Sequence, residues 1–109
     1  MPAMMDYADA GPTMIDAMNS PGGRAFMGTD INDARMSDLL FVPRLGDATK
    51  SRLSAAGITT VKQLVGMFWV KETPEAFKEW LEGTGVQAAI NTSGAITIVI
   101  NNYCVTNGL

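Results

Sequence analysis

The C-terminal part of this chain constrains its fold most, because residues 84–109 contain no Asp, Glu, Lys or Arg side chain. Within it, the run AITIVI at residues 95–100 alternates isoleucine with threonine and valine, which is the two-residue period of a β-strand. The sequence therefore predicts two extended runs, at 86–90 and 95–100, joined by the turn NTSG into an uncharged β-hairpin tail over residues 86–109. Such a hairpin is marginal by itself in water.

The predicted hairpin must be covered by other protein. An uncharged, β-branched run without proline is prone to aggregate when it is exposed. We therefore expect a helix or a second chain against it, and a protein interface formed by Ile96, Ile98, Ile100, Tyr103 and Trp69.

Composition narrows the classes of function. A chain of 109 residues is a single domain by size, and its formal charge of −3 gives no strong overall attraction for nucleic acid. The single cysteine, Cys104, excludes an internal disulfide framework, and the absence of histidine removes the usual zinc ligand and proton carrier. We find no catalytic constellation and expect no enzyme activity, no metal and no cofactor.

The N-terminal segment and the apolar runs bear on location. No apolar run approaches the roughly 20 residues that a membrane-spanning helix needs, and the segment MPAMMDYADAG has acids where a signal peptide has basic residues. We expect an intracellular protein that is not secreted and does not insert into a membrane.

Charge divides the chain into three parts. Residues 1–36 are rich in Met, Ala and Gly and carry more acidic than basic side chains, which predicts an extended acidic arm. Acidic and basic side chains balance over residues 37–83, so the folded core is expected over 37–85. Residues 86–109 form the predicted tail. For the chain as a whole, the expected fold class is mainly α.

Helix signals are dense in the middle part. Asp47 to Ala56 has helical spacing and is followed by Gly57, a preferred residue after a helix end. Thr60 and Gln63 form a capping-box pattern before a second helix, and Thr73 with Pro74 begins a third that stops at Gly83. A shorter helix is expected near 30–40 and must end before Pro43. The expected core positions are Val61, Leu64, Val65, Phe68, Phe77, Trp80 and Leu81.

The middle part also resembles a known family. The glycine-containing turn before a basic helix, the run LVGMFWV and above all the block FKEWLEGTG make residues 42–85 similar to the barrier-to-autointegration factor family. The resemblance implies a helix-hairpin-helix core and non-specific binding and bridging of double-stranded DNA by a homodimer. It covers neither the arm nor the tail, which replaces the final helix of that family.

The resemblance places a nucleic-acid site at the hairpin. Backbone N–H groups at the helix start and nearby cations would contact phosphates there, which selects Arg44, Leu45, Gly46, Lys50 and Arg52. Two features depart from the pattern. Arg44 stands where the hairpin has a glycine, and Asp47 occupies the first helical turn, where it competes with a phosphate.

Two classes of function follow. In the first, which we favour, the chain is a non-enzymatic structural protein whose arm and tail bind neighbouring chains in a homo- or hetero-oligomeric assembly, such as a virion that holds it as a minor capsid protein. In the alternative, it binds and bridges double-stranded DNA. Negative charge, the replaced hairpin glycine and the uncharged tail favour the first class.

Overall fold

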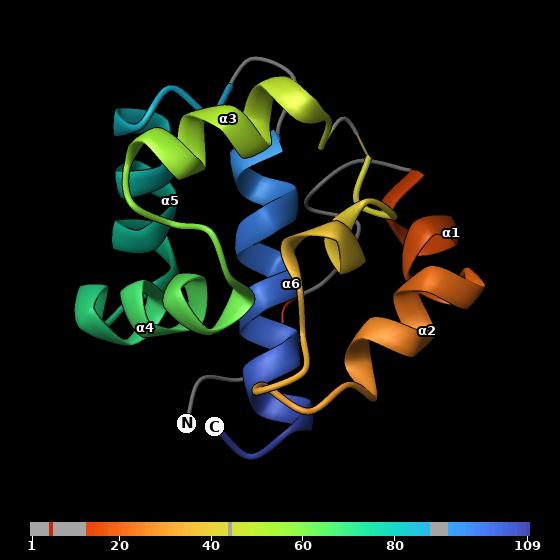
Figure 1. Cartoon of the computed structure of the whole chain (residues 1–109). Helices are drawn as coiled ribbons and strands as arrows, with labels where there is room; N and C mark the ends of the chain where they lie inside the picture. The colour runs from red at the N-terminus through yellow and green to blue at the C-terminus, as the bar shows by residue number, and fades with distance from the viewer. Residues whose placement is uncertain (1–4, 6–12, 44, 88–91) are drawn as a thin grey trace.

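The computed structural model describes residue 5 and residues 13–43, 45–87 and 92–109. This part of the chain is helical, with six α-helices and one 3-10 helix (Figure 1). The elements are α1 (Thr13–Asn19), α2 (Pro21–Met27), η2 (Met36–Leu39), α3 (Asp47–Ala55), α4 (Val61–Lys71), α5 (Pro74–Gly83) and α6 (Thr92–Thr106).

Helix α6 is the centre of the molecule. It runs through the middle of the fold, with α4 and α5 on one side and α1 and α2 on the other (Figure 1). Every residue from Thr92 to Cys104 is buried, so α6 contacts protein on all of its sides. The uncharged tail is thus the central helix of the core.

The predicted β-hairpin is therefore wrong. Apart from one isolated bridge between Arg35 and Thr60, the described residues contain no β-structure. A helix that is buried all round needs no 3.6-residue pattern, so the alternation of Ile with Thr and Val carried no information about its period. Burial outweighs the weak preference of β-branched residues for strands. Part of the predicted first run and turn, residues 88–91, lies outside the described residues.

The same burial corrects the predicted interface. Ile96, Ile98, Ile100 and Tyr103 are each at most 2% exposed. Ile96, Ile100 and Tyr103 belong to the core of this chain, and the Tyr103 hydroxyl donates to the Thr29 carbonyl oxygen. These four side chains already have their neighbours within the chain and are not available to a partner in this conformation.

The N-terminal arm was also predicted to be extended, but its described part contains helices. Residues 13–27 form α1 and α2, with Met14, Met18 and Phe26 buried, and Phe26 packs against Tyr103 at a ring-centroid distance of 4.7 Å. Ser20 caps α2 and Pro21 begins it, which is a start signal that sequence reasoning missed. Residues 1–4 and 6–12 of the arm lie outside the described residues.

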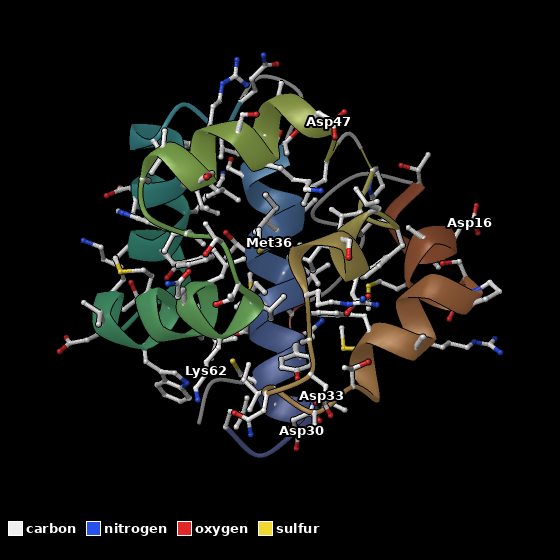
Figure 2. All side chains as sticks on the ribbon, in the orientation of Figure 1. Asp16, Asp30, Asp33, Met36, Asp47 and Lys62 are labelled. Atoms are coloured by element: carbon white, nitrogen blue, oxygen red, sulfur yellow. The ribbon has the colours of Figure 1, made fainter. Side chains whose placement is uncertain are left out.

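The acidic side chains of this region lie outside the core. Asp16 on α1 and Asp30 and Asp33 after α2 are exposed, in agreement with their places at the edge of the molecule (Figure 2). The negative charge of residues 13–36 therefore belongs to a packed helical layer.

The three helices predicted in the middle part are confirmed, and the first of them is α3, Asp47–Ala55. Thr60 and Gln63 form the capping box of α4, and Thr73 caps α5 with Pro74 in its first turn. The core side chains Phe68 and Phe77 meet edge to face, with ring centroids 5.3 Å apart, and join α4 to α5. The shorter helix expected near 30–40 is reduced to the single 3-10 turn η2, which lies before Pro43.

Candidate functional site

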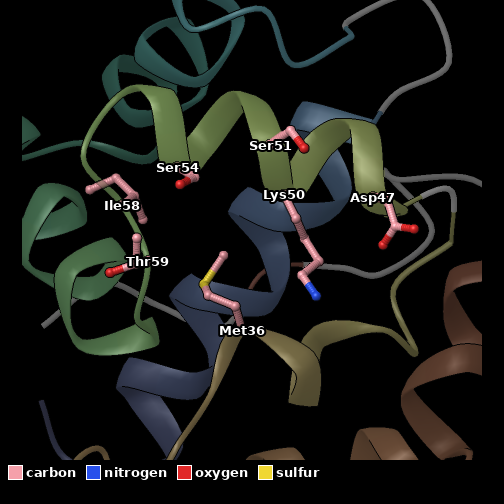
Figure 3. A pocket seen from close by; sticks show the side chains of 7 residues that line it. All are labelled: Met36, Asp47, Lys50, Ser51, Ser54, Ile58 and Thr59. Carbon is pink, nitrogen blue, oxygen red and sulfur yellow. The ribbon is translucent and has the colours of Figure 1, made fainter.

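A pocket of about 380 Å³ lies along one face of α3 (Figure 3). The helix contributes polar side chains spaced one turn apart, and η2 and the segment before α4 contribute two apolar side chains. The lining residues are Met36, Asp47, Lys50, Ser51, Ser54, Ile58 and Thr59. Lys50 extends from α3 towards the segment that carries Met36 (Figure 3).

The four predicted nucleic-acid residues that the structure describes do not form one surface. Gly46 is the exposed N-cap of α3, and Lys50 lies one turn further on, in the pocket. Leu45 is only 5% exposed and belongs to the core. Arg52 lies on another side of α3, next to Gly85. A Cβ atom added at Gly85 would lie 3.1 Å from the Arg52 Cδ. Arg44 lies outside the described residues.

An acidic side chain lies at the start of α3. Asp47 stands in the first turn and lines the same pocket as Lys50. A carboxylate at this place already stabilises the positive end of the helix dipole. Among the described side chains, a phosphate at Gly46 would therefore meet the cation of Lys50 and the anion of Asp47.

A second surface lies on α4. Trp69 is 43% exposed and Val70 is 68% exposed, and Gly66 is exposed one turn earlier on the same side of the helix. We call Gly66, Trp69 and Val70 the α4 face. Of its residues, only Trp69 was predicted at a protein interface. The signal for Val70 is the apolar run from Met67 to Val70, because four successive residues of a helix cannot all point into one core.

Gly66 has no role that this chain explains. A Cβ atom added at this position would meet no atom within 4 Å. The φ angle of Gly66 is not positive, unlike the φ angles of Gly57, Gly85 and Gly108. A glycine inside a helix destabilises it by about 1 kcal/mol relative to alanine. Space for the close approach of another molecule is a reason for glycine at an exposed helix position.

The described residues offer few other groups that could react or bind a ligand. Burial raises the pKa of the Cys104 thiol to about 11, so the thiol is protonated at neutral pH. Within the described residues, no group of three or more His, Cys, Asp or Glu side chains is placed to hold a metal ion. No described helix is both long and apolar enough to cross a membrane.

Comparisons with protein-family models, curated protein sequences and solved structures found no match.

Proposed function

We propose that this chain is a non-enzymatic assembly protein that binds a second copy of itself through the α4 face. The observation that carries the proposal is the exposure of Trp69 and Val70 beside a glycine whose missing side chain leaves open space. Tryptophan is enriched at the centres of protein interfaces, where it contributes much of the binding energy.

The proposed contact joins the α4 face of one copy to the α4 face of another. In a two-fold symmetric contact the same patch of both copies meets, so each contact between two different residues occurs twice. Two α4 helices that cross between Gly66 and Trp69 would place the Trp69 ring of each copy over the open position at Gly66 of the other. Small residues at a crossing allow two helices to approach closely, and the large neighbouring side chains then bury the contact. The homodimer implied by the family resemblance agrees with this arrangement.

The test compares a charge placed on the α4 face with the same charge placed elsewhere. We expect the molar mass of the wild-type chain in light scattering to rise with concentration from 11.6 kDa towards twice that value. Val70→Lys should stay at the mass of one chain, because it would bury a lysine between two copies.

Leu40→Lys is the matched control, since Leu40 is 53% exposed and lies outside the α4 face. It should associate as the wild type does. A wild-type mass that stays at one chain at every concentration, or an equal loss in both variants, would overturn the proposal.

Binding of double-stranded DNA at α3 is the second candidate. It is favoured by Gly46, an exposed N-cap that leaves the first amides of α3 open to an anion, and by Lys50 one turn away. The family resemblance supports it, and the negative net charge and Asp47 oppose it.

Its test is a gel-shift titration at several salt concentrations. If Lys50 contacts a phosphate, Lys50→Ala should weaken binding and lower the salt slope by about 0.9. Lys62→Ala is the control, because Lys62 lies on α4 and donates to Asn32 Oδ1 at 3.1 Å. Absence of binding by the wild-type chain at low salt removes this candidate.

A further inference from the structure

The pocket along α3 presents two opposite charges that are not paired with each other. Its polar side chains, Asp47, Lys50, Ser51 and Ser54, follow at intervals of three or four residues and share one face of α3 (Figure 3). Among the described residues, the ion pairs lie elsewhere, at η2 and on α5. The carboxylate and the ammonium group of the pocket are therefore both open to a ligand.

The two charges stand close enough for one small molecule to meet both. Side chains three residues apart on a helix are neighbours, with about 5–6 Å between their Cβ atoms. Asp47 and Lys50 have this spacing, and both line the pocket. Exposed charges of this kind gain little from direct contact with each other, so a ligand that binds both of them displaces little.

The side of the pocket that faces α3 is apolar. Met36 and Ile58 are each 7% exposed and belong to the core, so the core reaches the surface at this pocket. The pocket volume of about 380 Å³ lies near the lower end of the range of roughly 300–1,000 Å³ that is typical of ligand sites. The pocket therefore suits a small ligand with a short apolar part.

We propose that this pocket binds a free α-amino acid with an apolar side chain. Such a molecule carries its ammonium group, its carboxylate and its apolar group on one carbon atom. The ammonium group donates to the Asp47 carboxylate, and the carboxylate accepts from Lys50 Nζ. The apolar group covers Met36 and Ile58. The serine hydroxyls on the same face of α3 provide further donors to the ligand carboxylate.

A ligand with a single charge fits this pocket less well. A simple carboxylate or a phosphate gains the contact with Lys50 but also lies near the Asp47 carboxylate, which repels it. An amine without a carboxylate has the converse disadvantage. An amino acid meets each charge with its opposite, so the pocket distinguishes it from both. This binding does not depend on the α4 face, and it goes beyond the assembly proposed above.

An NMR titration of the full ¹⁵N-labelled chain with L-leucine tests the site. The backbone amide signals of α3 should shift and saturate with a Kd on the order of 1 mM. Three analogues each lack one group: leucinamide lacks the carboxylate, isocaproate lacks the ammonium group, and glycine lacks the apolar side chain. Each should bind about tenfold more weakly than leucine. Absence of saturable shifts up to about 20 mM leucine, or equal binding of leucine and any analogue, would overturn the proposal.

Variants of the two charged residues test the role assigned to each. Lys50→Gln should weaken leucine binding by about tenfold and should not weaken leucinamide binding, because leucinamide has no carboxylate. Asp47→Asn should weaken leucine binding by a similar factor and should not weaken isocaproate binding. Lys62→Gln is the matched control, since Lys62 lies on α4 and donates to Asn32 Oδ1. Equal losses in Lys50→Gln and Lys62→Gln would contradict the site.

Discussion

At the scale of single residues, two exposed glycines have different physical reasons. Gly57 follows α3 with a φ of 88°, and the Ile58 N–H returns to the Leu53 carbonyl oxygen at 2.8 Å, which is the helix-ending pattern that glycine favours. Sequence reasoning placed this glycine correctly, because its cause is local. Gly66 has no local cause, so its meaning became visible only when the structure showed an open face around it.

Alanine at these two positions should have opposite effects. Gly57→Ala forces a side chain into the left-handed region and should lower the free energy of unfolding by about 1–2 kcal/mol. Gly66→Ala meets no atom within 4 Å and should raise it by about 0.5–1 kcal/mol, through helix propensity. Urea denaturation at low protein concentration measures both. A destabilised Gly66→Ala monomer would contradict the open space described here.

At the scale of elements, helix ends were predictable and the central helix was not. Capping pairs such as Thr60 with Gln63, and Thr73 with Pro74, act within one turn, so the residues that mark α4 and α5 also cause their starts. Helix α6 depends on the helices around it. Its Ile and Val residues favour a strand by themselves, and contact with α2, α4 and α5 makes the helix the better state. Ile96, Ile98, Ile100 and Tyr103 of the predicted interface are buried for the same reason.

The cap of α5 provides a prediction at this scale. The Thr73 hydroxyl accepts from the Ala76 N–H at 3.1 Å, and Thr73→Ala should lower the free energy of unfolding by about 1 kcal/mol. Thr106→Ala is the control, since Thr106 is exposed in the last turn of α6. The two variants should differ in their urea midpoints and share the wild-type slope. Equal midpoints would show that the cap contributes nothing.

At the scale of the whole molecule, stability is linked to pH through the core around α6. Burial raises the pKa of Cys104 from its ordinary 9.0 to about 11, and burial, followed by the charges of Asp30 and Cys104, also raises the pKa of Tyr103. The folded chain keeps protons that the unfolded chain loses above pH 9. Stability from Cys104 is therefore complete below pH 9 and is lost as pH rises towards 11.

Urea denaturation between pH 8 and pH 11 tests this linkage. The free energy of unfolding should fall over the range, and Cys104→Val should fall less, because it removes one of the two shifted groups. The comparison uses the change with pH in each protein, so a constant effect of the substitution on packing does not enter. Identical pH dependence in both proteins would contradict a buried, protonated thiol.

The α4 contact between two copies is the central claim, and an isotope-filtered NOE experiment tests it most directly. A mixture of ¹³C-labelled and unlabelled chains reports only contacts between different copies. The two-fold contact predicts NOEs from the Trp69 indole protons of one copy to the Gly66 Hα protons of the other. A chain that stays monomeric at NMR concentrations, or a dimer whose intermolecular NOEs all lie outside the α4 face, would contradict the account.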